Sequence, residues 1–251
     1  MKTIVIKIGG STLGEHDTTL EDIVELQKKG MCAVVVHGGG RKITEWLNKL
    51  GLPTTYKNGL RVTDEQCLEV VVAVLCGIVN KELVSAINKL GGKAVGVSGF
   101  DGGMVDAEVI DEKLGFVGEV KKVNTAPIKS LIDAGYIPVI APGGHTGEHM
   151  LNINADTIAG EIAVAIKADE IIFLTDVDGV RDKSGTLFTT LYKEEVGSLL
   201  DMEVISGGMV PKIYACLRSL LSVDVARVVD GRQPHALMEV IEGKSIGTVI
   251  K

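Results

Sequence analysis

The sequence predicts an α/β protein in which a mainly parallel sheet carries helices on both faces. Short runs rich in valine and isoleucine recur along the chain, as is typical of strands buried on both faces. Segments with apolar residues at helical spacing lie between these runs, and strand, glycine turn and helix follow one another twice before residue 52. Glycine clusters follow several of the runs, at 9–10, 38–40, 99–103 and 143–144.

The composition fits a globular protein with a large core. Of the 251 residues, 45% are hydrophobic and 24% are charged, enough for one large domain or two closely joined lobes. A net charge of −7 and 4% aromatic residues argue against nucleic acid or an anionic membrane as a partner. No apolar run is expected to reach the roughly 20 residues of a membrane helix, and with a strand from residue 3 no signal peptide is expected. Four cysteines without C-x-x-C spacing are typical of reduced thiols in a cytoplasmic protein: Cys32, Cys67, Cys76 and Cys216.

The first predicted strand, 3–8, carries Lys7 near its end and runs directly into Gly9 and Gly10. A cation is costly in a buried strand unless an anion lies nearby, and glycines let backbone N–H groups approach a ligand. Taken alone, this stretch favours a lysine that extends to solvent beside an ordinary turn. The second strand, however, ends in a similar way at 37–40, and a second lysine follows much later, so a phosphoryl site is the better interpretation.

Helices are predicted after each of the first two strands. A capping box at 18–21 begins the first helix, and Gly30 ends it. The second strand, 33–36, leads through the glycine triplet to an amphipathic helix over 41–51. This repeat is the βαβ pattern of a parallel sheet.

Residues 53–63 interrupt this pattern. An Asn-Gly pair predicts a hairpin turn with Arg61 beside it. The hairpin either closes over a ligand or is a solvated surface hairpin, which is the more common fate of such an arginine. A long apolar helix is predicted over 64–90, with Thr63 and Gln66 as a cap pair.

The remaining elements complete the sheet and its helices. We place a division between two lobes near residue 150, and because no linker separates them, the lobes should share one continuous sheet. A mobile polar loop is expected over 142–149. The other predicted strands are 94–97, 137–140, 171–175, 225–229 and 247–250; a second hairpin is predicted over 104–123; and the other predicted helices are 125–134, 156–167, 193–200, 209–221 and 234–242.

Several strand ends are expected to converge on one anionic ligand. In an open α/β sheet, ligands bind outside the C-terminal ends of the strands, where the glycine clusters of this sequence lie. Neither G-x-x-x-x-G-K-[ST] nor G-x-G-x-x-G follows the first strand, which argues against a P-loop and against a nicotinamide dinucleotide site.

Polar side chains also follow the later strands. Asn152, Asn154 and Asp156 alternate along an extended segment, which puts all three on one side; Asp156 could equally cap the next helix. Asp176 and Asp178 follow another buried strand and could bind a metal, cap a helix or bind a ribose.

A glycine loop precedes the helix 209–221 and puts Lys212 in its first turn. A helix N-terminus already attracts phosphate, and a lysine there adds a full charge. His145 and His149 have the spacing of metal ligands but no third ligand in register, so no metal centre made of side chains is expected. His37 is interpreted as a residue that shapes the backbone, not as a base.

In order, these segments resemble the motifs of the amino acid kinase family, in the branch that phosphorylates N-acetyl-L-glutamate: 7–11, 37–40, 58–63, 152–156, 175–180 and 207–212. The resemblance covers essentially the whole chain. The first motif is shared across the family, whereas 58–63 and 152–156 are specific to this branch. The family implies a three-layer αβα sandwich around a mainly parallel central sheet. It implies an N-terminal lobe, 1–151, for the acyl amino acid and dimerisation, and a C-terminal lobe, 152–251, for ATP.

The resemblance also implies a role for each matching residue. Lys7 and Lys212 would stabilise the phosphoryl group in transfer, and Asp156 would orient both lysines. Gly10 and Gly39 would donate backbone N–H groups to that phosphoryl group. The acceptor would be bound by Gly39, Gly40, Arg61, Asn152 and Asn154, and the nucleotide by Gly9, Ser11, Thr175, Asp176, Asp178, Gly179, Val180, Ser206, Gly208 and Met209.

The activity implied by the resemblance is ATP-dependent phosphorylation of the side-chain carboxylate of N-acetyl-L-glutamate, a step of arginine biosynthesis. No general base is required, because a carboxylate acceptor is already ionised at neutral pH. Mg²⁺ would be held mainly by the nucleotide phosphates and water.

Two other functions stay open. A sister kinase would act on another acid, such as carrier-bound aminoadipate, carbamate or UMP, and would need a different acceptor hairpin. A non-catalytic nucleotide-binding regulator would need affinity only, so the presence of Lys7, Lys212 and Asp156 argues against it.

A homodimer is expected. The predicted helix 64–90 has apolar residues on more than one face, and the second face forms either a dimer contact or a contact beneath the sheet. Arginine-inhibited members of the family carry a helix before the first strand that links dimers into hexamers. Because the first strand here starts at Thr3, we expect a plain homodimer that is insensitive to arginine.

Overall fold

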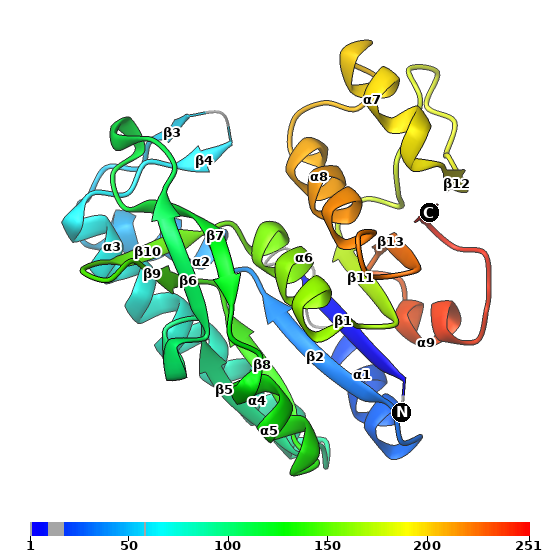
Figure 1. Ribbon diagram of the computed structural model, residues 1–251, viewed down its shortest axis with the longest axis horizontal. Helices are drawn as coiled ribbons and strands as arrows, with labels where there is room; N and C mark the ends of the chain where they lie inside the picture. The colour runs from blue at the N-terminus through cyan, green and yellow to red at the C-terminus, as the bar shows by residue number, and fades with distance from the viewer. Residues whose placement is uncertain (1, 10–17, 58) are drawn as a thin grey trace.

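The computed structural model describes residues 2–9, 18–57 and 59–251. Within these residues the chain forms a central sheet in the order β12-β14-β13-β11-β1-β2-β8-β5 (Figure 1). Every neighbouring pair in it is parallel except β13 with β14. Its strands are β1 (Thr3–Ile8), β2 (Cys32–His37), β5 (Ala94–Ser98), β8 (Ile137–Ala141), β11 (Glu170–Thr175), β12 (Thr190–Leu191), β13 (Val225–Asp230) and β14 (Thr248–Ile250).

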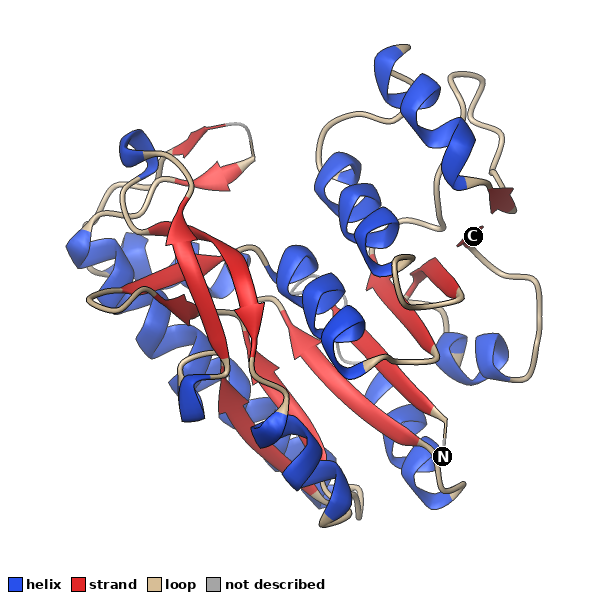
Figure 2. Cartoon of the chain, in the orientation of Figure 1, coloured by secondary structure: helices blue, strands red, loops and turns tan. Residues whose placement is uncertain are grey.

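Helices cover both faces of this sheet and make it the middle of three layers (Figure 2). One face packs against α1, α2, α3, α4 and α9, and the other against α5, α6, α7 and α8. The three-layer αβα sandwich is therefore confirmed, and strands from both sides of residue 150 share its sheet. The helices are α1 (Thr19–Lys28), α2 (Gly40–Lys49), α3 (Glu65–Val72), α4 (Asn80–Lys89), α5 (Ala126–Asp133), α6 (Ala155–Ile166), α7 (Lys193–Asp201), α8 (Met209–Ser219) and α9 (Ala236–Ile241), with 3₁₀ turns at Asp101–Gly103 and Glu112–Leu114.

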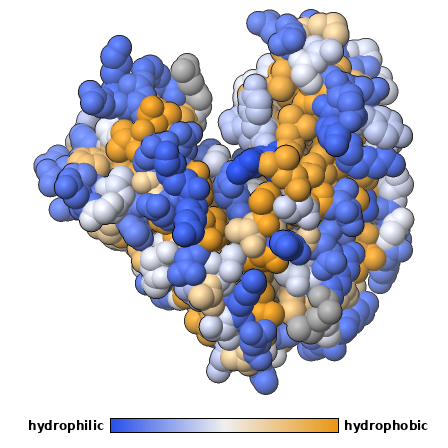
Figure 3. Space-filling model, viewed as in Figure 1, coloured by the Kyte–Doolittle hydropathy of each residue, from blue (hydrophilic) through white to orange (hydrophobic). Residues whose placement is uncertain are grey.

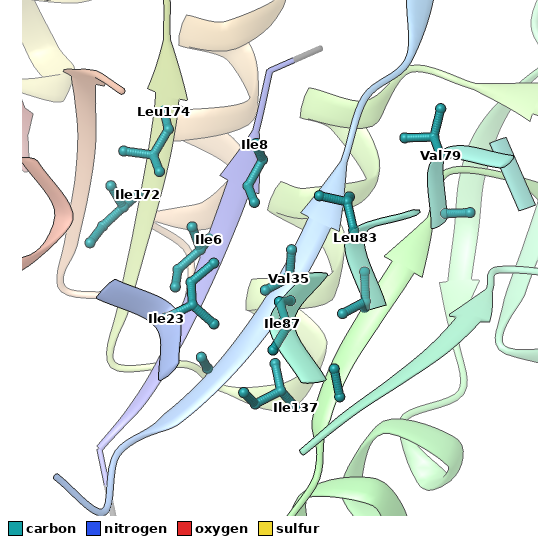
Figure 4. Packing of buried hydrophobic residues seen from close by; sticks show 14 of the residues in the cluster. Ile6, Ile8, Ile23, Val35, Val79, Leu83, Ile87, Ile137, Ile172 and Leu174 are labelled. Atoms are coloured by element: carbon teal, nitrogen blue, oxygen red, sulfur yellow. The ribbon is translucent and has the colours of Figure 1, made fainter. Parts of the chain in front are cut away.

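The core forms because successive residues of the central strands point to opposite faces of the sheet. Ile4, Ile6 and Ile8 of β1 enter one apolar cluster, where Ile23 of α1 packs beside them (Figure 4). Val5 enters the cluster on the opposite face. Each fully buried isoleucine contributes about 1.5–3 kcal/mol of apolar burial, so both layers of helices are held by the same short strand.

A smaller sheet packs on the same face as α5 and α6. It runs in the order β10-β7-β6-β9 and closes on itself. The hairpin predicted over 104–123 is confirmed, whereas the loop predicted over 142–149 is wrong at Gly144–His145, where a two-residue strand pairs with β10. So short a strand leaves no alternating pattern in a sequence. The strands are β6 (Val105–Val109), β7 (Val117–Val123), β9 (Gly144–His145) and β10 (Met150–Ile153).

The helix predicted over 64–90 is confirmed as a continuous stretch, Glu65–Lys89, with a π-helical segment at Ala73–Val79 between α3 and α4. With a mean hydropathy of 2.0 in its most apolar window, this stretch is long and apolar enough to cross a membrane. The expectation that no apolar run has that length is therefore wrong. Only 39% of the window is buried, on the side where the helix packs beneath the sheet as a core helix.

Three helix caps differ from those predicted. Thr18 makes no side-chain cap on α1, because its hydroxyl accepts the His235 N–H at 2.6 Å and so joins α1 to α9. Asp64, not Thr63, caps α3. Asn154 caps α6. Each of these polar side chains has several partners within reach, and the fold selects one of them.

A short hairpin of β3 (Tyr56–Lys57) and β4 (Leu60–Arg61) stands apart from the central sheet. In the space-filling view, the molecule is hollowed between the surface over this hairpin and the surface over α7 and α8 (Figure 3). The arrowheads of β1, β2 and β11 point toward this hollow (Figure 1). The hollow is thus where the strand-end residues are expected to meet.

Candidate active site

The candidate site lies where the parallel strands end, and the backbone continues the ladder one residue beyond them. Gly38 N–H donates to Ile8 O at 2.9 Å, and Gly9 N–H donates to Leu174 O at 3.1 Å. The ends of β2, β1 and β11 are therefore held side by side. Lys7 lies one residue before the end of the middle strand.

Lys7 and Lys212 share one carboxylate, that of Asp156. Lys7 Nζ lies 2.8 Å from Asp156 Oδ1, and Lys212 Nζ lies 2.9 Å from Asp156 Oδ2. All three side chains are about nine-tenths buried. Burial, followed by the charge of Lys212, lowers the pKa of Lys7 from its ordinary value. Burial alone would raise the pKa of Asp156, but the charges of both lysines hold it below its ordinary value, so this carboxylate is ionised at neutral pH.

The local fold of α6 explains how Asp156 reaches both lysines. Asn154 caps the helix by accepting the N–H groups of Asp156 and Thr157 at 2.8 and 3.2 Å. The Asp156 side chain is therefore not needed as a cap. A Cβ at Gly160 would lie 2.9 Å from Ala215 O, so α6 and α8 approach closely at this glycine. This close packing brings Lys212 of α8 within reach.

Arg61 forms part of the wall of a pocket of about 190 Å³. Its Nη2 donates to Gly40 O at 3.0 Å, to Thr44 Oγ1 at 2.9 Å and to the Tyr56 hydroxyl. The guanidinium carbon lies 4.8 Å from the centre of the Tyr56 ring. Its Nη1 is buried and has no hydrogen-bond partner within the described residues. A buried guanidinium with an unused nitrogen indicates a site for an anion, and carboxylates match that geometry best.

Asn152 lines the same pocket from β10. Its Nδ2 donates to Thr63 Oγ1 at 3.1 Å, and Thr63 Oγ1 donates to Arg61 O at 2.8 Å. This chain of hydrogen bonds joins the short hairpin to the smaller sheet. The structure thus brings the predicted acceptor residues Arg61 and Asn152 together.

The glycine turn 38–40 also lines this pocket, as does Asn154. A Cβ at Gly39 would lie 2.5 Å from Leu75 Cδ2, so the long helix packs directly on the turn. The next helix, α2, begins at Gly40 and has no acidic residue in its first turn. The positive end of its dipole therefore adds to the charge of Arg61 in attracting an anion.

A second pocket, of about 560 Å³, lies at the ends of β11 and β13. Asp230 and Arg232 line it, and Arg232 Nε and Nη2 donate to the two Asp230 oxygens at 2.9 and 2.8 Å. These hydrogen bonds lower the pKa of Asp230. The pocket has about three times the volume of the Arg61 pocket and suits a larger ligand. Four predicted nucleotide residues line it: Asp176, Asp178, Gly179 and Met209.

Other predicted nucleotide residues lie outside the residues that line this pocket. Val180 is buried and its N–H donates to Thr248 Oγ1 at 2.8 Å, so it supports the loop from within. Ser206 and Gly208 form the turn before α8, where Met209 N–H donates to Ser206 O at 3.3 Å.

The remaining predictions concern the first glycine turn and the end of β11. The N–H of Gly9 is used by the strand ladder, contrary to the expectation that it is free for a ligand. Gly10 and Ser11 lie outside the described residues. Thr175 ends β11, and its hydroxyl lies 3.3 Å from Asp176 Oδ1.

The sequence analysis missed Tyr56 and Thr44, which hold Arg61, and the pair Asp230 and Arg232 in the second pocket. Asp230 is the last residue of the strand β13 and Arg232 comes two residues later, so the strand-end pattern used for Asp176 applies to them as well. The register of the predicted hairpin places Tyr56 opposite Arg61, so this tyrosine could have been found from the sequence. Nothing in the sequence marks Thr44, because it contacts Arg61 only after the hairpin has folded onto α2.

Within the described residues, no group of three or more His, Cys, Asp or Glu side chains could hold a metal ion. His145 Nδ1 lies 3.1 Å from Thr146 O, and the His149 ring packs edge-on against Phe116.

Comparison with known proteins agrees with this geometry. The model of the amino acid kinase family matches residues 2–229. The acetylglutamate kinase of Thermosynechococcus vestitus is 46% identical over 261 residues, covering 99% of this chain and 88% of that protein. The acetylglutamate kinase of Dehalococcoides mccartyi strain BAV1 is 41% identical over 254 residues, covering 98% of this chain and 93% of that protein. The solved structure of smu.665 from Streptococcus mutans UA159 has a TM-score of 0.87 and 31% sequence identity, covering 99% of this chain and 98% of that chain. With a match over most of its length and the motif residues gathered at one edge of its sheet, the chain belongs to the amino acid kinase family.

Proposed function

We propose that this protein acts as an acetylglutamate kinase. It transfers the terminal phosphoryl group of ATP to the side-chain carboxylate of N-acetyl-L-glutamate, giving N-acetyl-L-glutamyl 5-phosphate and ADP in the second step of arginine biosynthesis. The observation that carries the proposal is the pair of buried ammonium groups held by one carboxylate, with Lys7 and Lys212 at 2.8 and 2.9 Å from Asp156. The acetylglutamate kinases that are 41% and 46% identical over almost the whole chain support the choice of acceptor.

In the proposed step, an oxygen of the acceptor carboxylate attacks the γ-phosphorus. The bond from that phosphorus to the oxygen that bridges to the β-phosphate breaks, and its electron pair leaves with ADP. No proton is transferred, because the acceptor is already ionised. Lys7 and Lys212 neutralise the charge on the phosphoryl oxygens, and Asp156 holds them in place beforehand, so little reorganisation is needed in the transition state.

The Arg61 pocket takes the acceptor in this proposal. The unused Nη1 of Arg61 binds a carboxylate, and Asn152, Asn154, Gly39 and Gly40 line the rest of the pocket, where the two glycines would donate backbone N–H groups to the acceptor. These groups belong mostly to the proposed N-terminal lobe, 1–151.

The second pocket takes the nucleotide and belongs to the proposed C-terminal lobe, 152–251. Its larger volume suits a base and a ribose, and the carboxylate oxygens of its aspartates can each accept more than one hydrogen bond. Mg²⁺, which ATP-dependent transfer uses, is held mainly by the nucleotide phosphates and water, because the described residues offer no cluster of metal ligands.

We propose further that the enzyme is a cytoplasmic homodimer. The cysteines are all free, as is typical of a reducing compartment. Ala73 and Gly77 are exposed on the outer face of the long helix, next to the half-buried Val72 and Cys76. This small-residue, apolar face is the one proposed to meet a second copy of the chain.

The activity is tested by mixing the purified protein with ATP, Mg²⁺ and N-acetyl-L-glutamate and following ADP release. Hydroxylamine converts an acyl phosphate to a hydroxamate and releases phosphate, so hydroxamate formed in step with ADP identifies a carboxylate acceptor. Carbamate, UMP and carrier-bound aminoadipate are assayed in parallel. Lys121→Ala, at an exposed lysine paired with Glu108, serves as a control that should stay fully active. Faster turnover of another acceptor, or no ADP release at all, would contradict the proposal.

A further inference from the structure

His37 is a buried titratable side chain that the proposed chemistry does not use. It ends β2 directly before the glycine turn 38–40 and is fully buried. Its Nδ1 lies 2.9 Å from Gly38 O, and its Nε2 lies 3.2 Å from Asn80 Nδ2. Burial lowers the pKa of His37 from 6.5 to about 4, so the ring is neutral at physiological pH.

The partners of the ring determine which nitrogen carries the hydrogen. A carbonyl oxygen can only accept, so Nδ1 is protonated and donates to Gly38 O, while Nε2 accepts from the Asn80 amide. The orientation of this amide is consistent with its other contacts. Asn80 Nδ2 also donates to Val139 O at 2.9 Å, and Asn80 Oδ1 accepts from Lys81 Nζ at 2.9 Å.

The hydrogen bond to Gly38 O determines where the next N–H points. The described peptide bonds are trans, and in a trans peptide the C=O and N–H groups point in opposite directions. Holding Gly38 O against the His37 ring therefore directs Gly39 N–H away from the ring. Gly39 lines the acceptor pocket, and its N–H donates no hydrogen bond within the part of the chain that the structure describes.

The surrounding elements are shaped to bring Asn80 to this ring. Asn80 directly follows the π-helical segment, from which Leu75 packs on Gly39. Single π turns in long helices are frequent at functional sites. On the other side, a Cβ at Gly96 of β5 would lie 2.0 Å from Asn80 Oδ1, so only glycine leaves room for this amide.

We propose that His37 and Asn80 are positioning residues that act on the reaction through Gly39. His37 holds the peptide between Gly38 and Gly39 so that the Gly39 N–H faces the phosphoryl group in transfer, and Asn80 holds the His37 ring. Neither side chain touches the reacting atoms. The role rests on the proposed kinase function, because a donor fixed in advance contributes most where charge develops in a transition state.

A matched pair of substitutions separates positioning from packing. In His37→Asn the side-chain amide puts a donor near the position of Nδ1, so the bond to Gly38 O can re-form. In His37→Gln the amide reaches the position of Nε2 and that bond is lost. Because loss of a transition-state donor costs about 10²–10³ in kcat, we expect His37→Gln to lower kcat by about tenfold or more. His37→Asn should keep kcat within about threefold of wild type, and the KM for ATP should change little in either variant.

A second measurement does not depend on activity. With ¹⁵N-labelled histidine, NMR of the wild-type protein should show His37 at pH 7 as a neutral ring with the hydrogen on Nδ1. An Nε2-protonated ring, or a charged ring, would overturn the proposal whatever the enzyme phosphorylates. If the wild type releases no ADP with any acceptor, the kinase assignment fails, while this tautomer still tests the geometry around Gly38.

Gly96→Ala provides a remote variant in case the His37 variants do not fold. Its Cβ should displace Asn80 from the ring, and we expect kcat to fall while the KM for ATP stays near that of the wild type. Equal kcat in His37→Gln, His37→Asn and the wild type would defeat the positioning role and leave the kinase assignment intact. So would equal losses in both His37 variants, because only packing would then be at stake.

Discussion

At the scale of single residues, Asp156 is the shared counter-ion of two lysines, and this determines what its loss would do. Asp156→Asn leaves two buried ammonium groups facing each other, whereas Lys7→Met leaves Asp156 paired with Lys212. Breaking a buried pair costs about 3–5 kcal/mol, so we expect Asp156→Asn to lower the free energy of unfolding by about that amount. Lys7→Met should lower the free energy of unfolding by less. Urea denaturation at pH 7 compares the two, and a larger loss in Lys7→Met would contradict the shared-counter-ion interpretation.

The two lysines should matter far more for rate than for affinity. Because their charges act on the phosphoryl oxygens, Lys7→Ala and Lys212→Ala should each lower kcat on the order of a hundredfold or more, with smaller changes in the KM for N-acetyl-L-glutamate. Steady-state kinetics with saturating ATP measures this. A kcat close to that of the wild type in either variant would remove that lysine from the proposed mechanism.

Arg61→Ala should have the opposite kinetic signature. The unused Nη1 of Arg61 points to uniform binding of an acceptor carboxylate, so its loss should raise the KM for the acceptor and leave the KM for ATP nearly unchanged. Arg61→Lys provides the matched control, because it keeps the positive charge but lacks the paired N–H donors of the planar guanidinium. It should recover only part of the affinity for the acceptor. If both KM values rose together, the assignment of this pocket to the acceptor would be wrong.

The sequence predicted these residues because each stands at a strand end or a helix start, where the side-chain type itself indicates chemistry. The sequence did not predict how the roles are divided between neighbouring polar residues. Asn154 and Asp156 are both good caps, and only the close packing of α6 on α8 shows that Asn154 caps while Asp156 faces the lysines. Thr44 was missed because an ordinary threonine acquires its role only from a tertiary contact with Arg61, whereas Tyr56 could have been found, because it pairs with Arg61 across the short hairpin.

At the scale of elements, His235 joins α9 to α1. Its ring Nδ1 lies 2.7 Å from Oδ1 of the buried Asp22, and its backbone N–H donates to Thr18 Oγ1 at 2.6 Å. The hydrogen bond to Asp22, followed by the carboxylate charges of Asp22, Glu21 and Glu239, raises the pKa of His235 above its ordinary value of 6.5.

This raised pKa predicts a pH dependence of stability. A group whose pKa is raised by folding stabilises the protein fully below its unfolded pKa and loses that contribution as the pH rises through the folded pKa. We therefore expect the free energy of unfolding to fall as the pH rises above 6.5. His235→Asn should lack this fall, because asparagine tolerates the left-handed backbone at this position and does not titrate. Urea denaturation at several pH values between about 6 and 9 makes the comparison, and parallel curves for both proteins would refute it.

Elements with a long, strong pattern were predictable, whereas elements that depend on partners were not. The central strands and the helix Glu65–Lys89 follow from apolar runs and helical spacing. The two-residue strands β9 and β12 exist only because longer strands lie beside them. The π-helical segment Ala73–Val79 has no recognisable sequence signal. It lies where Leu75 packs on Gly39, a contact between residues far apart in the chain.

At the scale of the whole molecule, the proposed dimer makes the outer face of the long helix the contact surface. Gly77 is exposed there, and a Cβ added to it would have no described atom within 4 Å, so Gly77→Arg should fold normally and disrupt only the dimer. Gly197→Arg on α7 is the matched control, because Gly197 is equally exposed and open. Sedimentation should give a dimer for the wild type and Gly197→Arg and a monomer for Gly77→Arg. A wild-type monomer, or no effect of Gly77→Arg, would place the contact elsewhere.

The three-layer architecture followed from the alternation of strands and helices, but the order of the strands did not. Nothing local in the sequence says that β1 lies between β2 and β11, since that arrangement joins residues far apart in the chain. The convergence of the motifs on one edge was predictable only because parallel strands end on the same side.

The central position of β1 has a consequence for how the protein is made. Thr3 N–H donates to Asp169 Oδ2 at 2.7 Å, a partner 166 residues away, and β11 follows directly after that aspartate. While the chain is still emerging from the ribosome, β1 can pair with β2 but its other edge has no strand beside it. An uncovered edge of isoleucine and valine is a template for aggregation, and contacts between such distant residues form slowly. The strand that carries Lys7 is therefore translated long before β11 and is among the last to be enclosed, so the nascent chain should need protection until residues near 175 have been synthesised.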